Sequence, residues 1–180
     1  MHVLLHFPKF RLTIVPLFSL EAVPMMTEYD TVLLAEDDEN DVLLFQTAFK
    51  KVGVPKLLVC VPDGEDAIKY LKGTGIYSNR IQYPLPCLLI TDLKMARRTG
   101  FDLLEWVQTQ TQFTCLPTIV LSSSVEESDK RRASKLGAQA FWVKPAHFEE
   151  LVDLVCLLKE KWLTPHHEPA NLSSIQNRLP

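Results

Sequence analysis

Five short apolar segments, each followed by a stretch with helical spacing, constrain the fold of this chain more than any other feature. The apolar segments are continuous rather than alternating, which is typical of strands buried on both faces of a sheet. The stretches between them repeat apolar residues every three or four positions, as amphipathic helices do. Five such units predict an α/β domain, with a parallel sheet between two layers of helices. The predicted strands are Thr31–Ala35, Leu57–Val61, Leu88–Thr91, Thr118–Leu121 and Ala140–Val143.

Capping residues mark the ends of several predicted helices. Asp38 is the predicted N-cap of the first helix, and Asp41 three residues later makes a variant of the capping box. Gly53, Gly73 and Gly137 are predicted to end the first, second and fourth helices, because glycine readily adopts the left-handed conformation found there.

The composition predicts one folded domain between two segments that lie outside it. The chain has 180 residues, of which 47% are hydrophobic and 23% charged, as expected of a folded globule. We predict that residues 26–163 form the domain, that 1–25 are an N-terminal extension, and that 164–180 are a disordered tail. Met25 or Met26 is a plausible start of translation, which would leave the extension out of the native protein.

Charge and cysteine usage narrow the class of protein. The net charge of −3 argues against direct nucleic-acid binding, which requires a basic surface. The apolar N-terminal stretch is interrupted by charges and prolines, so no membrane span is predicted. The cysteines lack metal-ligand spacing and are predicted to be reduced core residues in a cytoplasmic protein. They are Cys60, Cys87, Cys115 and Cys156.

Polar residues of complementary chemistry follow four of the five predicted strands. Glu36 and Asp37 follow the first strand, Asp92 the third, Ser122 the fourth and Lys144 the fifth. Because the carboxyl ends of parallel strands meet at one edge of a sheet, we expect these side chains to converge. Three clustered carboxylates repel one another unless cations are present. Lys144 supplies one positive charge, and Mg²⁺, which prefers oxygen ligands, suits the remainder.

Asp38 has two interpretations. It is contiguous with Glu36 and Asp37, so it is an alternative metal ligand. Its position at the start of a helix favours the N-cap role instead.

Four stretches, LLAEDDEND, LLITDLKM, IVLSSS and FWVKP, occur in this order between about residues 31 and 162. They resemble the receiver domains of bacterial two-component response regulators. The resemblance implies a doubly wound, flavodoxin-like (βα)5 fold with strand order 2-1-3-4-5. It also implies a regulator that accepts a phosphoryl group from a histidine kinase and relays the signal by a conformational switch. The chain resembles single-domain members, and its long segment before the third strand resembles the branch that partners bacterial phytochrome-like histidine kinases.

The resemblance implies a role for each residue of the predicted site. Asp92 is the implied phosphorylation site. Ser122, Lys144 and the backbone N–H of Ser123 are implied to contact the phosphoryl group, and Phe141 to change rotamer when Ser122 moves. The Lys144–Pro145 peptide bond is implied to be cis.

The resemblance also implies the ligands of Mg²⁺, which are Glu36, Asp37, Asp92 and the backbone carbonyl of Lys94. The sequence departs from the family after Asp92. Ala96 replaces the usual proline, so we expect a looser loop there. Lys94 is a long cation beside the acceptor, and we expect it to slow self-dephosphorylation.

Three classes of function remain open. The first is the phosphoryl-accepting switch, which catalyses only its own phosphorylation and dephosphorylation and is otherwise not an enzyme. The second is a pseudo-receiver, an interaction module that works without phosphorylation. The third is a phosphatase with an aspartyl nucleophile, which Lys94 disfavours because such enzymes usually carry a second acidic residue at that position.

The expected partners are a sensor histidine kinase, hybrid kinase or phosphotransfer protein, and an unknown downstream protein. The last predicted helix, Phe148–Trp162, suggests a homodimer as well. Leu154 and Leu157 lie off its main apolar face, so they are either scattered apolar residues or part of a dimer or partner patch.

Overall fold

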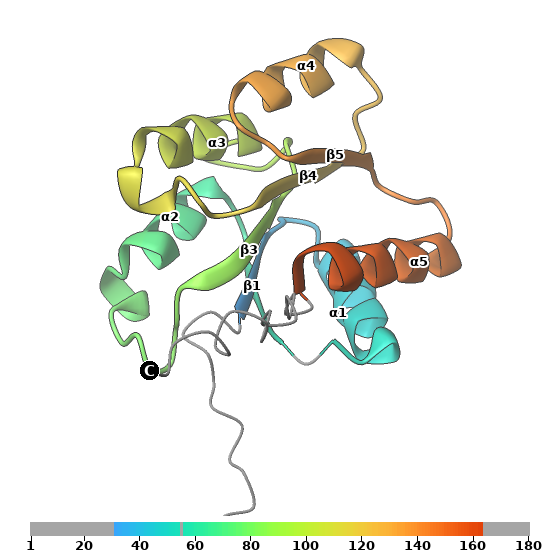
Figure 1. The fold of residues 1–180 in the computed structure, drawn as a ribbon, viewed down its shortest axis with the longest axis horizontal. Coiled ribbons are helices and arrows are strands. Elements are labelled where there is room, and N and C mark those ends of the chain that lie inside the picture. The colour runs from blue at the N-terminus through green and yellow to red at the C-terminus, as the bar shows by residue number, and fades with distance from the viewer. Residues whose placement is uncertain (1–30, 55, 164–180) are drawn as a thin grey trace, which may run out of the picture.

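A five-stranded parallel sheet forms the centre of the molecule (Figure 1). The computed structural model describes residues 31–54 and 56–163, so the predictions for residues 1–25 and 164–180 lie outside the described residues. The strand order is β2-β1-β3-β4-β5, which confirms the fold class and order expected from the resemblance. The strands are β1 (Thr31–Ala35), β2 (Leu57–Val61), β3 (Pro86–Thr91), β4 (Thr118–Ser122) and β5 (Ala140–Val143).

Helices cover both faces of this sheet. Figure 1 shows α1 and α5 together on one side, and α2 and α3 on the other. The last α-helix continues as a π-helical turn over Lys159–Leu163. The α-helices are α1 (Glu39–Val52), α2 (Gly64–Lys72), α3 (Gly100–Thr109), α4 (Glu127–Lys135) and α5 (Phe148–Leu158).

Strand β1 shows why its sequence is apolar at every position. Successive side chains of a strand point to opposite faces of the sheet. Val32 and Leu34 pack with residues of α1 and α5, whereas Leu33 and Ala35 pack with residues of α2 and α3. Because helices cover both faces, all five residues of β1 are buried, and this places its polar continuation at the edge of the sheet.

The predicted helix ends are present. The side chain of Asp38 accepts hydrogen bonds from the backbone N–H groups of Asn40 and Asp41, as an N-cap does. Gly53 and Gly73 end α1 and α2 with φ angles of 63° and 67°, which are unfavourable for residues with a side chain. Gly137 also has a positive φ, just after α4.

Two expectations about individual side chains were wrong. Leu154 is only 8% exposed and packs in the core formed by α1, α5 and the sheet, so it is not part of a surface patch. Leu157 is 56% exposed. None of the four cysteines, all of which the structure describes, forms a disulfide, but Cys115 is exposed rather than a core residue, because it lies in the turn before β4.

The segment between α2 and β3 is anchored to the domain. The guanidinium of Arg80 donates hydrogen bonds to the carbonyl oxygens of Tyr70 and Leu71, at 2.8 and 2.6 Å. The ring of Tyr77 lies 5.2 Å from those of Tyr70 and Tyr83, measured between centroids. These contacts give the segment a defined conformation.

Candidate functional site

Three carboxylates meet where β1 and β3 end. Oxygen atoms of Glu36, Asp37 and Asp92 all lie within 4.8 Å of one another. The two strands are neighbours, and the backbone N–H of Asp92 donates to the carbonyl of Ala35 at 3.0 Å. Glu36 and Asp92 are each 5% exposed, whereas Asp37 is exposed. The topology therefore brings together the acidic residues that the strand ends predicted, and it removes two of them from water.

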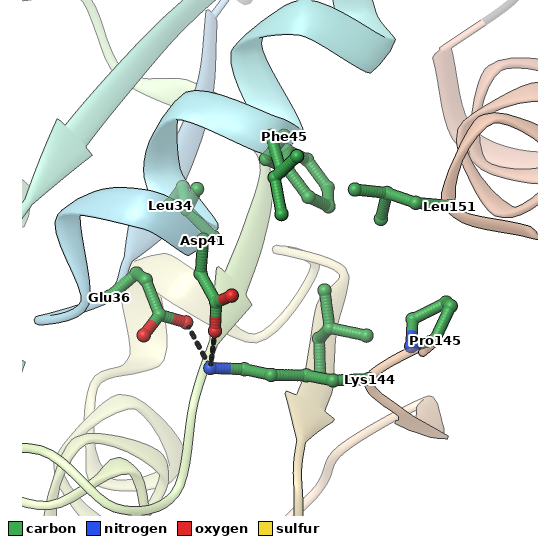
Figure 2. Close-up of a pocket in the computed structure, with 9 residues that line it drawn as sticks. Leu34, Glu36, Asp41, Phe45, Lys144, Pro145 and Leu151 are labelled. Carbon is green, nitrogen blue, oxygen red and sulfur yellow. Dashed lines mark hydrogen bonds and ion pairs between the residues drawn. The ribbon is translucent and has the colours of Figure 1, made fainter. Parts of the chain in front are cut away.

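Lys144 brings a positive charge to this cluster from the end of β5. Its ammonium nitrogen lies 2.7 Å from Glu36 Oε2, 3.0 Å from Asp92 Oδ2 and 2.7 Å from Asp41 Oδ2. Figure 2 shows the Lys144 ammonium directed at the carboxylates of Glu36 and Asp41, in a pocket that Phe45 and Leu151 also line. One lysine thus bridges the carboxylate of Asp41 on α1 and the two carboxylates that follow β1 and β3.

The pKa values of Lys144 and Glu36 both lie above their ordinary values. Burial by itself lowers the pKa of Lys144, but hydrogen bonds to Asp41, Glu36 and Asp92 outweigh it, so the pKa lies above its ordinary value. Burial raises the pKa of Glu36, although Lys144 acts in the opposite direction. Lys144 therefore remains protonated near neutral pH, and the carboxylates exceed the single positive charge that it provides.

The chemistry of the cluster fits a hard divalent cation. The donor atoms are carboxylate oxygens held close together, which is the ligand type that Mg²⁺ and Ca²⁺ prefer. Asp38 is not in this cluster, because its carboxylate caps α1, and the N-cap interpretation holds.

Backbone N–H groups orient the other oxygens of the cluster. Asp92 Oδ1 accepts hydrogen bonds from Leu93 and Lys94 at 2.5 and 3.3 Å. Asp37 Oδ2 accepts one from Ala96 at 3.2 Å, which links β1 to the loop after β3. Gly100 is required at the start of α3, because a Cβ there would lie 2.0 Å from the backbone oxygen of Asp92.

The remaining predicted residues lie at the same end of the sheet. Ser122 is fully buried at the end of β4, and its carbonyl accepts the N–H of Lys144 at 2.9 Å. Ser123 follows it and is exposed. Phe141 on β5 is half-buried and packs against a cluster that includes Leu93, the residue after Asp92. The ring of Phe141 therefore belongs to the same packed group of side chains as the residue that follows Asp92.

Sequence reasoning missed Asp41 and misassigned one peptide bond. Asp41 was interpreted as a capping-box residue, but its carboxylate turns to Lys144, and the N–H of Asp38 donates to Glu36 instead. A hydrogen bond between two charged groups is stronger than one between a carboxylate and a neutral N–H. The carboxylate of Asp41 therefore faces Lys144 rather than the N–H of Asp38. The Lys144–Pro145 bond is trans rather than cis, in agreement with the intrinsic preference of X–Pro bonds.

Comparison with known proteins agrees with this geometry. The family model for the response regulator receiver domain matches residues 32–156. The response regulator Rcp1 of Synechocystis sp. is 27% identical over 139 residues, which cover 77% of this chain and 92% of Rcp1. The crystal structure of the phosphorylated cyanobacterial phytochrome response regulator RcpA superposes with a TM-score of 0.69 at 29% identity, covering 76% of this chain and 95% of RcpA.

A Mn²⁺-bound crystal form of Rcp1 superposes with a TM-score of 0.68 at 26% identity, covering 76% of this chain and 96% of that one. A protein of this fold therefore binds a divalent cation, in line with the three carboxylates that meet at the ends of β1 and β3 in this chain. The match of the family model over most of the sequence, together with the strand order, identifies this chain as a member of the response regulator receiver domain family.

Proposed function

We propose that this protein is a response regulator that accepts a phosphoryl group on Asp92 from a sensor histidine kinase or a phosphotransfer protein. The observation that carries the proposal is the ammonium of Lys144, held 3.0 Å from Asp92 Oδ2 beside a cluster of three carboxylates. Receiver domains are generally signalling modules rather than enzymes acting on separate substrates. The intact acidic cluster and its lysine favour phosphorylation over a pseudo-receiver role.

In the proposed reaction, a carboxylate oxygen of Asp92 forms a bond to the phosphorus of a phosphohistidine. The P–N bond breaks, and its electron pair stays on the imidazole nitrogen, which is then protonated from solvent. Lys144 is placed to stabilise the negative charge that reaches Asp92. Ser122, with the N–H of Ser123 beside it, is the proposed hydrogen-bond donor to the new phosphoryl oxygens.

The cation proposed for this site is Mg²⁺. Its ligands would be Glu36, Asp37, Asp92 and the backbone carbonyl of Lys94, and it would supply positive charge that offsets the phosphoryl oxygens. The support on this chain is the set of closely spaced carboxylate oxygens, two of which belong to buried residues. Glu36 and Asp92 share the positive charge of Lys144, so a second cation has unpaired carboxylate charge to neutralise.

The proposed output is a change in the surface around α4 and β5. Phe141 packs against a cluster that includes Leu93, which follows Asp92, and Ala133 on α4, and its rotamer is the proposed link between the acceptor and this surface. A downstream protein is the proposed reader, and Leu157 on α5 is an exposed apolar residue for a homodimer contact. Within residues 31–54 and 56–163, no helix has the length and apolar character to cross a membrane.

The proposed kinase class follows from one relative. RcpA is described as a phytochrome response regulator, and it covers three quarters of this chain. A phytochrome-like histidine kinase is therefore the proposed phosphodonor for this protein. Transfer from a purified kinase of this class, compared with an unrelated histidine kinase, would test that assignment.

The central test is phosphorylation in the absence of a kinase. The full chain is incubated with Mg²⁺ and acetyl phosphate, and its mass is measured. We expect one phosphoryl group on the wild type and on Asp153→Asn, an exposed control on α5, and none on Asp92→Asn. No adduct on the wild type would favour the pseudo-receiver, whereas continuous hydrolysis of phosphate esters would favour the phosphatase.

A further inference from the structure

The loop that follows Asp92 is held from two sides. On one side, the N–H of Ala96 donates to Asp37 Oδ2 at 3.2 Å. On the other side, the carbonyl of Arg98 accepts the N–H of Gly64, the first residue of α2, at 3.1 Å. Between these two contacts lies Arg97, with a φ angle of 60°. Few residues other than glycine adopt this backbone conformation, so the surrounding contacts must maintain it.

The side chain of Arg97, which is 53% exposed, makes a further contact. Its guanidinium forms an ion pair with Asp63 and lies 3.6 Å from Asp66 Oδ2. Asp63 is only 2% exposed, and its other carboxylate oxygen caps α2 by accepting the N–H of Asp66 at 2.9 Å. A buried carboxylate needs a cationic partner, and Arg97 supplies the ion pair to it.

We infer that the Arg97–Asp63 ion pair is a positioning element that holds the loop after Asp92 in the shape required for cation binding and phosphorylation. The inference rests on the proposed function of the site. Arg97 pairs with Asp63 and not with the three clustered carboxylates, which include the acceptor, so it acts through the backbone. It directly follows Ala96, whose N–H donates to Asp37, and it lies three residues after Lys94, whose carbonyl is the proposed further ligand.

We expected the loop to be loose because Ala96 replaces the usual proline, and the Arg97–Asp63 pair offers another way to restrain it. A proline at that position would restrict the chain through its ring. Here a side-chain contact to a buried carboxylate on the neighbouring βα connection restricts it instead. The rigidity of the loop therefore depends on a charge pair between two connections, and disrupting either partner should release it.

The test measures Mg²⁺ affinity of the full chain by titration calorimetry, with phosphorylation by acetyl phosphate as a second readout. Arg97→Asn removes the ion pair and keeps a residue that tolerates a positive φ. Asp63→Asn removes the charge and keeps an oxygen that can cap α2. We expect each variant to bind Mg²⁺ about fivefold more weakly, and the double variant to be no weaker than either.

The direction in which the Mg²⁺ affinity changes distinguishes a positioning role of Arg97 from the electrostatic effect of its charge. Loss of the positive charge of Arg97 would by itself strengthen Mg²⁺ binding, because one repulsive charge is gone. Arg98→Asn makes the same charge change at the exposed neighbouring position, and we expect no weakening there. Unfolding curves for each variant check that the domain is folded. If Asp63→Asn does not fold, Arg97→Asn and Arg98→Asn decide the question alone.

Failure of the inference is distinguishable from failure of the proposed function. A wild type that binds no Mg²⁺ and takes no phosphoryl group overturns the proposed function. A wild type that does both, with an Arg97→Asn variant that binds Mg²⁺ equally or more tightly, overturns the positioning role. So does a double variant whose loss is the product of the two single losses.

Discussion

Two lysines of this protein hold a carboxylate at the same distance in different surroundings. Lys144 Nζ lies 2.7 Å from Glu36, and their side chains are 18% and 4% exposed. Lys130 Nζ lies 2.7 Å from Glu127 on the surface of α4, where the side chains are 37% and 69% exposed. Water and salt weaken the second pair, whereas separating the first leaves a carboxylate buried without its partner. Burial, not distance, therefore ranks their importance.

The two pairs also differ in what they require of the fold. Lys130 and Glu127 are three residues apart on one helix, so helical geometry alone brings them together. Lys144 meets Glu36 and Asp92 only when β1, β3 and β5 take their places in one sheet. The buried pair thus forms only when the strands are assembled in the sheet, so its loss indicates that the site is disrupted.

The largest effect is expected from a variant that removes the buried pair of Lys144 and Glu36. Lys144→Met keeps most of the alkyl volume and removes the ammonium, which leaves Glu36 and Asp92 buried without their cation. We expect the free energy of unfolding to fall by about 3 kcal/mol in urea without divalent cations. The matched change Lys130→Met should leave the unfolding midpoint close to that of the wild type. Equal losses in the two variants would contradict the ranking by burial.

Addition of Mg²⁺ should act on the interior site alone. At a free concentration ten times the dissociation constant, binding to the folded state raises the free energy of unfolding by about 1.4 kcal/mol. We expect this gain in the wild type and in Lys130→Met, and its loss in Asp37→Asn. A gain that survives in Asp37→Asn would place the cation elsewhere. Removal of Mg²⁺ with EDTA should reverse the shift.

A smaller effect tests the partner that sequence reasoning missed. Asp41→Asn removes one of three carboxylates around Lys144, and Asp41 is itself 39% exposed. We expect a loss of about 1 kcal/mol in urea unfolding, because the bond is charge-assisted but partly solvated. Glu39→Gln, another acidic change in the first turn of α1, controls for the helix dipole and should cost less. Equal losses would show that Asp41 acts only as a helix-start residue.

The smallest effect is expected for the exposed pair of Lys130 and Glu127 on α4. The interaction between Lys130 and Glu127 should vanish in 1 M salt, where the screening length is about 3 Å. A double-mutant cycle with Lys130→Met and Glu127→Gln, measured at low and high salt, checks this. A coupling that persists at high salt would show that the pair on α4 is protected from solvent.

Much of the fold could be predicted because its signals are local and periodic. Continuous apolar runs located all five strands, and β1, β2 and β5 have the predicted bounds. The acidic cluster followed from one rule, that parallel strands end at the same edge. The burial of Leu154 did not follow, because helical periodicity gives a direction around the axis and not the width of the face that neighbouring elements cover.

The choice of side-chain partners was less predictable. Asp41 had a local interpretation as a capping residue, and only its proximity to Lys144 shows the stronger competitor. Asp63 and Arg97 lie on different connections, and neither stands at a predicted strand end. Nothing in a single sequence signals such a pair, because it depends on how closely two loops approach.

By itself, the sequence determined the five-unit architecture and the set of residues at the strand ends, Glu36, Asp37, Asp92, Ser122 and Lys144. Pattern and topology suffice for this, since every strand of a parallel sheet delivers its final residue to the same edge. Only the tertiary structure decided that Asp41 joins Lys144 and that Arg97, in the loop after Asp92, pairs with Asp63, the N-cap of α2. Those contacts depend on distances between elements far apart in the chain, which are set by packing.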